Sequence, residues 1–220
     1  MNATFPPPRI ILFAKAPIPG RVKTRLHGML TPSGAAALHE AMAEDMLTLL
    51  TSFLPVATVE LHTDVPTVAW PRFVGTRRLQ SEGDLGRRLF TALQGALQEG
   101  SPLALILGSD SPGLPPGHIE RLLACPDDLR LGPAADGGFY AIAARRVSPA
   151  MFAGVRWSSP YTLADTLSSA RAAGLSADTG DPWFDIDEPA SLARLHELTG
   201  LGPRTSAWLA AWHTSAPTSE

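Results

Sequence analysis

The sequence is short of cysteine and of long apolar runs, and each shortage excludes a class of protein. Its 220 residues include one cysteine, Cys125, so the chain can form neither an internal disulfide nor a site of clustered cysteine ligands. Because Cys125 follows an apolar stretch with helical character, we expect a small buried side chain rather than a catalytic thiol. No apolar run approaches about 18 residues, and no secretory signal is visible near the start. We therefore expect a cytoplasmic protein without a membrane span.

An excess of positive charge is also missing. The chain has 18 basic and 21 acidic side chains and a formal net charge of −3. This balance gives no general attraction to nucleic acid or to an anionic membrane surface, so we expect no nucleic-acid partner. A chain of 220 residues suits one hydrophobic core. We expect a single domain over 1–220, with its core at about 9–198 and a C-terminal helix and tail at 199–220.

The apolar pattern predicts strands that alternate with helices. Short β-branched and aromatic runs predict strands at 9–14, 56–62, 103–108, 129–133 and 139–143. Helical spacing, capping residues and prolines predict helices at 31–53, 84–98, 116–124, 160–174, 189–199 and 203–212. The segment 64–79 shows no clear pattern. The alternation predicts an α/β fold, with a three-layer α/β/α arrangement around a mainly parallel central sheet. Ligands bind beyond the carboxyl ends of the strands in such sheets, which draws attention to the loops after 14, 108 and 133.

Cations gather in the loop after the first predicted strand. Four of them lie between 15 and 26: Lys15, Arg21, Lys23 and Arg25. The two lysines are the only ones in the chain, and no acidic residue precedes Glu40. Such a loop can hold a diphosphate by charge-assisted hydrogen bonds, and Gly20 lets the backbone come close. The loop matches neither the Walker A nor the dinucleotide-binding glycine pattern, and the alternative is a solvated basic loop.

Carboxylates follow two of the later predicted strands. Asp110 follows the most apolar strand and is well placed to hold Mg²⁺ or Mn²⁺ opposite phosphates, with a turn-capping aspartate as the alternative. Asp136 begins an Asp-Gly-Gly turn with Gly137 and Gly138. That turn is equally typical of a β-hairpin.

A third acidic segment lies at 178–188 and contains no basic residue. Asp185 and Asp187 fall on the same side of an extended segment, where like charges repel unless a cation or water separates them. Asp187 or Glu188 could instead cap the helix that begins at Pro189. Together with the basic loop, these carboxylates predict a site for a diphosphate and a divalent metal.

Five ordered motifs resemble those of one protein family. They are FAKAPIPGRVKTRL at 13–26, QSEGDLGRRL at 80–89, GSDSPGLP at 108–115, LGPAADGGFYAIA at 131–143 and DIDEPASLARL at 185–195. Over about 9–198 the chain resembles a family of small bacterial glycosyltransferase-like proteins, long described as a domain of unknown function. That family has the nucleotide-diphospho-sugar transferase (GT-A) type of fold, and some members are assigned as arsenosugar-biosynthesis glycosyltransferases.

The resemblance implies a role for each motif. The residues that would touch phosphates are Lys15, Arg21, Lys23 and Arg25, and those near the nucleotide would be Gln80, Asp84 and Arg87. Asp110 would take the place of the metal-binding aspartate. Serines flank it instead of a second aspartate, so the D-x-D pattern is missing, and Asp185 or Asp187 would supply the second metal ligand. Asp136, with Gly137 and Gly138, would face the acceptor or the sugar.

These features favour metal-dependent glycosyl transfer from a nucleotide sugar to a small-molecule acceptor. The metal and the basic loop would stabilise charge on the leaving diphosphate, and Asp136 would orient or deprotonate the acceptor hydroxyl. The alternative is nucleotidyl transfer, in which a substrate phosphate attacks a nucleoside triphosphate and pyrophosphate leaves. A third hypothesis, which rests on the lone aspartate of GSDSP, is a nucleotide-binding module without turnover.

Overall fold

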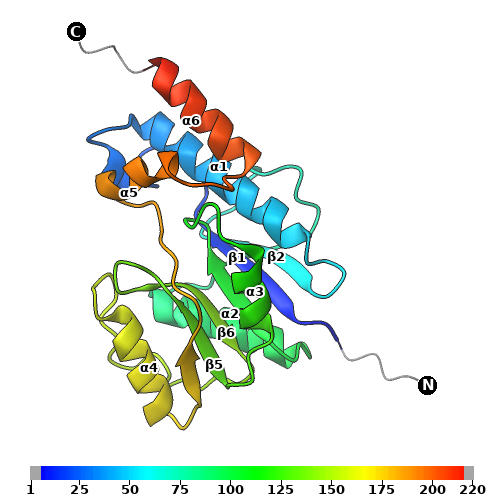
Figure 1. The fold of residues 1–220 in the computed structure, drawn as a ribbon. Coiled ribbons are helices and arrows are strands. Elements are labelled where there is room, and N and C mark those ends of the chain that lie inside the picture. The colour runs from blue at the N-terminus through cyan, green and yellow to red at the C-terminus, as the bar shows by residue number, and fades with distance from the viewer. Residues whose placement is uncertain (1–5, 216–220) are drawn as a thin grey trace.

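One sheet of seven strands runs through the molecule. The computed structural model describes residues 6–215 and orders the strands β3-β2-β1-β4-β6-β5-β7 (Figure 1). The strands are β1 (Arg9–Ala14), β2 (Thr58–Thr63), β3 (Thr76–Leu79), β4 (Ala104–Gly108), β5 (Leu129–Pro133), β6 (Phe139–Ala144) and β7 (Ala177–Thr179). β6 pairs antiparallel with β4 and β5, whereas the other neighbouring pairs are parallel. The C-terminal ends of all strands except β6 therefore lie at one edge of the sheet, together with the turn between β5 and β6.

Helices cover both faces of the sheet. α1 (Pro32–Thr51) and α3 (Pro116–Leu123) cover one face, and α2 (Leu85–Gln98) and α4 (Thr162–Ala172) cover the other. Alternation along β1 supplies both cores, because Ile10 and Leu12 pack with the α1 side while Ile11 packs with the α2 side. The predicted three-layer α/β/α arrangement around a mainly parallel sheet is confirmed.

Capping residues explain where the two long helices begin. The Thr31 side chain accepts a hydrogen bond from the amide of Gly34 at the start of α1, and Asp84 does the same for the amide of Arg87 at the start of α2. The buried residues of α2 are Gly86, Leu89, Leu93 and Ala96. Leu85, in the first turn of α2, is 46% exposed.

The C-terminal part packs on α1 rather than on the sheet. The predicted helix at 189–199 is shorter, and consists of α5 (Pro189–Ala193) and the 3₁₀ helix η2 (Arg194–His196). α6 (Pro203–Ser215) follows and lies beside α1 (Figure 1). Its free N-terminal amides are satisfied from α1, because the Asp45 carboxylate accepts hydrogen bonds from the backbone N–H groups of Arg204 and Thr205. The tail predicted beyond α6 at 216–220 lies outside the described residues.

The two edge strands, β3 and β7, were not predicted from the sequence pattern. β3 lies in the segment that showed no clear pattern, and β7 lies in the acidic segment. Their side chains are mostly exposed, so neither strand carries the apolar run by which the central strands were predicted.

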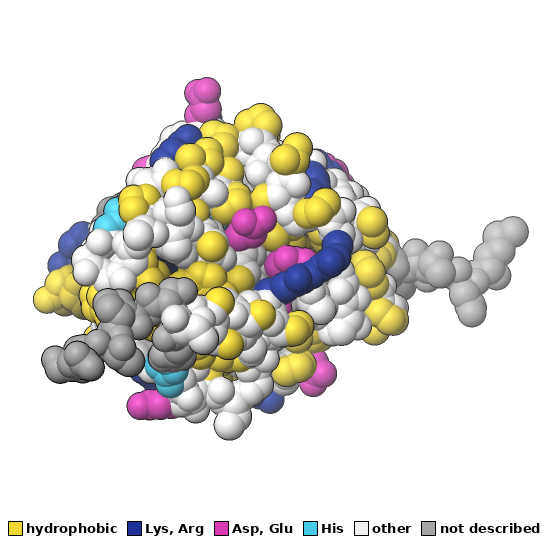
Figure 2. Space-filling model, turned by 90° about the horizontal axis from the view of Figure 1, so that it is seen from above, with side chains coloured by type: hydrophobic (Ala, Val, Ile, Leu, Met, Phe, Trp, Pro, Cys, Tyr) yellow, Lys and Arg dark blue, Asp and Glu magenta, His cyan; other side chains and the backbone are white. Residues whose placement is uncertain are grey.

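The surface and the buried thiol agree with the composition. On the face seen from above, basic side chains are scattered, and one near the middle lies beside acidic side chains (Figure 2). Cys125 is buried, as predicted. No helix in the described part of the chain combines the length and hydropathy needed to cross a bilayer.

Candidate active site

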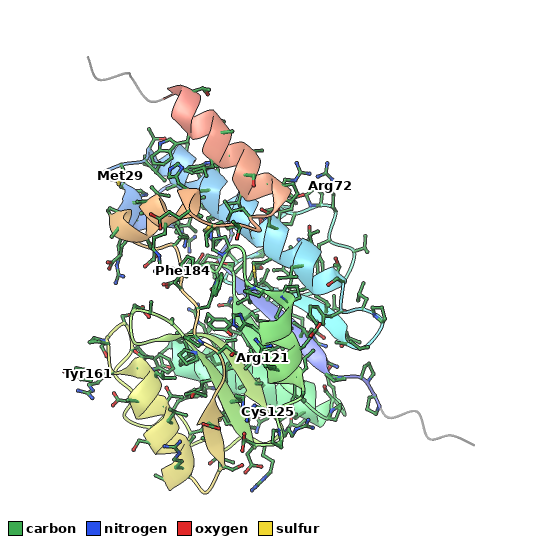
Figure 3. The ribbon with its side chains drawn as sticks, in the orientation of Figure 1. Met29, Arg72, Arg121, Cys125, Tyr161 and Phe184 are labelled. Atoms are coloured by element: carbon green, nitrogen blue, oxygen red, sulfur yellow. The ribbon has the colours of Figure 1, made fainter. Side chains whose placement is uncertain are left out.

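The sheet topology brings the predicted site loops to one edge. Five segments lie at the C-terminal ends of the parallel strands. They are the loop after β1, the segment between β3 and α2, the loop after β4, the β5–β6 turn and the segment before α5. Phe184, on the segment before α5, lies between the α1 layer and the β5–β6 part of the sheet (Figure 3). Backbone contacts fix this segment, since the amide of Ile186 donates to the carbonyl of Asp110 and that of Trp183 donates to the carbonyl of Pro133.

The loop after β1 is held from two sides. The carboxylate of Asp64, just past β2, accepts a hydrogen bond from the amide of Ala16 and lies 3.5 Å from the Arg21 guanidinium. On the other side, Nε2 of His39 lies 2.9 Å from the carbonyl oxygen of Lys15. The loop turns at Gly20, where φ is +82°, a conformation that favours glycine. The side chain of Lys15 is exposed, and its ammonium is thus open to a ligand.

Lys23 is the buried member of the basic loop. Its side chain is 2% exposed, and its ammonium lies 2.7 Å from Oδ1 of Asp110 and 4.0 Å from Oδ1 of Asp187. The same nitrogen donates a hydrogen bond to the carbonyl of Ile186. A buried ammonium requires such partners, because an unpaired charge is costly in the protein interior. One side chain therefore joins three of the site loops.

Asp110 receives donors from two elements at one oxygen. Besides Lys23, the Nδ1 atom of His39 lies 3.4 Å from Oδ1 of Asp110. Burial alone would raise the pKa of Asp110, but the charge of Lys23 and the His39 hydrogen bond hold it well below the ordinary value of 3.8. Asp110 is therefore a carboxylate at any physiological pH, and its side chain is 39% exposed.

The acidic segment divides into residues with different partners. Asp187 and Glu188 lie 3.2 and 3.3 Å from the Arg25 guanidinium. Glu188 also forms a capping box with Ser191 at the start of α5, so the capping alternative is confirmed for this residue. Asp185 differs, because burial raises its pKa and the charges of Asp136 and Asp110 raise it further. Asp110, Asp136 and Asp185 therefore bring their negative charges close together.

A cavity of about 240 Å³ opens beside these carboxylates. Its lining includes Arg25, Asp136, Asp185, Asp187 and Arg194. The Arg194 guanidinium stacks 4.0 Å above the centre of the Phe184 ring in a cation–π arrangement, at the wall of this cavity.

The Asp136 turn is the hairpin that the sequence offered as an alternative. β5 and β6 pair antiparallel, and Oδ1 of Asp136 accepts a hydrogen bond from the amide of Gly138. Gly137 has φ +86°, and a Cβ there would come within 2.3 Å of the carbonyl oxygen of Pro160. The turn therefore fixes the direction of Asp136 toward the cavity that this residue lines.

The residues predicted near the nucleotide lie between the end of β3 and the first turn of α2. The Gln80 side-chain amide donates to the carbonyl of His62 at 3.1 Å and, more weakly, to that of Ala14 at the end of β1. Asp84 caps α2, so its carboxylate has a structural partner in the amide of Arg87. The Arg87 side chain is exposed. These residues border the first loop, whereas Asp110 and Asp185 lie on its other side, toward β4 and α5.

The carboxylates suit a hard cation that arrives with a substrate. Within the described residues, no group of three or more His, Cys, Asp or Glu side chains is arranged to hold a metal ion. Mg²⁺ is commonly held by one or two carboxylates together with substrate phosphates. Asp110 and Asp185 supply such oxygens, and the raised pKa of Asp185 reflects a repulsion that a cation would relieve. The donor chemistry therefore fits, with Lys23 already beside one oxygen of Asp110.

Sequence reasoning missed His39 and Arg194. His39 is 3% exposed within α1, where a single histidine among alanines and leucines gives no motif. Arg194 lies inside the DIDEPASLARL motif, but only the fold shows that it stacks on Phe184 and lines the cavity.

Known proteins share the fold and part of the sequence. A family model described as "Uncharacterized protein conserved in bacteria (DUF2064)" matches residues 56–159. A phosphoenolpyruvate guanylyltransferase of Salinispora arenicola (strain CNS-205) is 29% identical over 204 residues, which cover 90% of this chain and 91% of that protein.

Two solved structures extend the comparison. A protein of Desulfovibrio desulfuricans G20, provisionally described as a nucleotide-diphospho-sugar transferase, has a TM-score of 0.83 and 28% identity over 94% of this chain and 95% of its own. The CTP complex of CMP:2-keto-3-deoxy-manno-octonic acid synthetase shares the fold at a TM-score of 0.53 and 14% identity, over 87% and 97%. The resemblance predicted from the motifs is confirmed: the chain matches the DUF2064 family over residues 56–159 and has the nucleotide-diphospho-sugar transferase type of fold.

Proposed function

We propose that the chain is a metal-dependent transferase that acts on a nucleoside-diphosphate donor, with glycosyl transfer to a small acceptor as its first candidate reaction. One observation carries the proposal. The loop that holds every lysine of the chain meets the carboxylates of Asp110, Asp185 and Asp187 at the C-terminal edge of the sheet. Cations and metal-binding oxygens at one edge suit a diphosphate with a divalent ion, Mg²⁺ or Mn²⁺.

In this proposal each loop has a separate task. Lys15, Arg21 and Arg25, which are exposed, bind phosphate oxygens, and Lys23 neutralises charge near Asp110. Gln80, Asp84 and Arg87 border the nucleotide, with Gly20 allowing close approach of the backbone. Asp110 holds the metal with Asp185 or Asp187. A metal supplies electrophilic stabilisation of charge on a leaving diphosphate.

The cavity beside Asp136 is the acceptor side of the proposed site. Asp136 lines it from a rigid turn and can orient or deprotonate an acceptor hydroxyl, while Gly137 and Gly138 shape its wall. Arg194 brings the N–H donors of a guanidinium to the same cavity. Such a group can bind a carboxylate, a phosphate or the oxygens of a sugar.

Nucleotidyl transfer is the second candidate, because the Salinispora relative that spans 90% of this chain is a guanylyltransferase. In that reaction the acceptor is a phosphate, and Arg25 and Arg194 supply positive charge at the cavity. The two reactions differ in the product that leaves. A nucleoside diphosphate indicates glycosyl transfer, and pyrophosphate indicates nucleotidyl transfer.

Thermal unfolding with a panel of nucleotide sugars and nucleoside triphosphates, each with and without Mn²⁺, tests the proposal. A ligand at about 100 times its Kd adds roughly 2.7 kcal/mol of stability, and each kcal/mol raises the Tm of a domain of this size by about 2–4 °C. We expect a metal-dependent rise with one donor, followed by detection of the corresponding product. No rise with any nucleotide would overturn the proposal, and binding without product would leave a binding module.

A further inference from the structure

Lys23 combines three properties that together are costly for a surface loop. Its ammonium is buried, its charge is shared among two carboxylates and a carbonyl, and its backbone is left-handed with φ 50° and ψ 38°. A residue with a Cβ in this region costs roughly 1–2 kcal/mol relative to the right-handed helix, whereas glycine costs little. Gly20, three residues earlier, takes such a conformation without a side chain. At position 23 the side chain must therefore contribute enough to offset the backbone cost.

The contribution of Lys23 is to neutralise Asp110 in the ligand-free protein. The ammonium lies 2.7 Å from Oδ1 of Asp110, and Nδ1 of His39 lies 3.4 Å from the same atom. Asp110 is also the carboxylate that the proposed function assigns to the divalent metal. A divalent cation bound at Oδ1 of Asp110 would lie close to the buried Lys23 ammonium, and two positive charges held this close, one of them buried, repel each other more strongly than they would in water.

Nucleotide phosphates would change this balance. They are anionic, and Lys23 belongs to the loop whose exposed cations face the proposed nucleotide site. An ammonium that gains phosphate oxygens as partners no longer depends on Asp110, and the carboxylate is then free for a metal.

We infer that Lys23 is an internal counter-ion that competes with the divalent metal for Asp110, so that metal and nucleotide bind together and each binds weakly alone. The inference rests on the proposed function and adds to it a positioning residue and a coupling between metal and nucleotide binding. Coupling between two ligands is reciprocal, so removal of the competing charge must show itself in metal binding even without nucleotide.

Mn²⁺ binding to the nucleotide-free protein tests the competition directly. Lys23→Gln keeps a hydrogen-bond donor for the Ile186 carbonyl but removes the charge, and Lys15→Gln removes the other, exposed lysine as a matched control. We expect Lys23→Gln to bind Mn²⁺ about tenfold more tightly than the wild type, within the usual range of coupling between sites. Lys15→Gln is expected to match the wild type. An affinity of Lys23→Gln equal to or below that of the wild type would overturn the inference.

A second measurement uses the wild-type protein, so the inference stays testable if Lys23→Gln fails to fold. Because the chain has two lysines, ¹³C-labelled lysine gives two side-chain sets of NMR signals, and Lys15→Gln assigns them. We expect Mg²⁺ with a nucleoside diphosphate to move the Lys23 signals, because the ammonium leaves Asp110. Lys23 signals that stay fixed while both ligands are bound would sink this inference alone. Failure of every nucleotide to bind would instead sink the proposed function.

Discussion

Two clusters of charge, one among the strands and one at the loops beyond their C-terminal ends, are built in opposite ways. The edge cluster consists of Arg9, Glu60, His62, Arg78 and Glu99, from β1, β2, β3 and the end of α2. The loop cluster consists of Lys23, His39, Asp110, Asp185 and Asp187. In the edge cluster each carboxylate has at least two cationic or histidine partners, on backbones of regular structure.

The loop cluster is less balanced and more strained. Lys23 has a left-handed backbone, and Asp185 has a raised pKa because burial and neighbouring carboxylates oppose its charge. By contrast, burial opposes the charge of Glu60 but His62, Arg9 and Arg78 outweigh it, so its pKa is lowered. Balanced charge stabilises a fold, while unbalanced charge at a sheet edge is typical of a site that awaits a ligand. From this contrast we infer that the edge cluster stabilises the fold and that the loop cluster binds the ligand.

The largest expected effect comes from Asp110→Asn. Loss of a preorganised charged group at a reacting centre commonly lowers turnover by about 10²–10³-fold, and we expect at least that loss. Steady-state rates with the donor found by thermal shift, at saturating Mn²⁺, measure it. A variant that folds and retains wild-type turnover would show that Asp110 takes no part in the reaction. The loop cluster would then not differ from the edge cluster in function.

Glu60→Gln is expected to act on stability instead. Its carboxylate is 6% exposed, so its loss leaves Arg9, Arg78 and His62 short of a buried partner. Glu99 still pairs with both arginines, so we expect a loss of about 2–3 kcal/mol in the free energy of unfolding, below the cost of an isolated buried pair. Urea denaturation measures it, with the exposed Glu120→Gln as control. Turnover per folded molecule should be unchanged, and a large fall would show that the edge cluster serves the reaction.

Arg194→Ala tests whether the cavity beside the loop cluster binds the acceptor. We expect KM for the acceptor to rise about tenfold, equivalent to 1.4 kcal/mol, with little change in KM for the donor. Arg146→Ala is the matched control, because Arg146 follows β6 at the opposite edge of the sheet and pairs with Asp128. Equal effects of the two variants would argue that the cavity does not bind the acceptor.

The smallest expected effect is a loss of folding stability at low pH. Hydrogen bonds from Arg78 and Arg9 lower the pKa of Glu99 from 4.5 to about 2, and the pKa of Glu60 is also lowered. Because the folded pKa values lie below the unfolded value, this stabilisation is present above pH 4.5 and is lost as the pH falls toward the folded values. Denaturation at several pH values should show a shallower acid loss in Glu60→Gln than in the wild type. Glu99 is 42% exposed, so solvent screening keeps its share small.

The central part of the fold was predictable because its strands bury both faces. The apolar runs that predicted β1, β4, β5 and β6 are the buried strands, and capping by Thr31 was visible as helix-start chemistry. β3 and β7 could not be read in this way, because edge strands with exposed polar side chains lack an apolar run.

The site was predictable by residue type and less so by partner. Strand-end positions pointed to Asp110 and to the basic loop, and the topology brings them together. The burial of Lys23 was not foreseeable, because its partners Ile186 and Asp187 lie more than a hundred residues away. His39 has no local motif, and its contact with Asp110 depends on how α1 packs against the sheet.

The hydrogen bond from Lys23 to the Ile186 carbonyl also determines when the site is completed during protein synthesis. The two residues are 163 positions apart, so at about 5–20 residues per second the ribosome needs roughly 8–30 s to deliver the second after the first. Until then Lys23 lacks its Ile186 and Asp187 contacts, and of its three partners only Asp110 has been synthesised. Segments separated this far along the chain assemble late, because loop closure precedes their contacts. The competence to bind substrate therefore arrives with the last quarter of the chain, and a prematurely terminated chain carries an unfinished site.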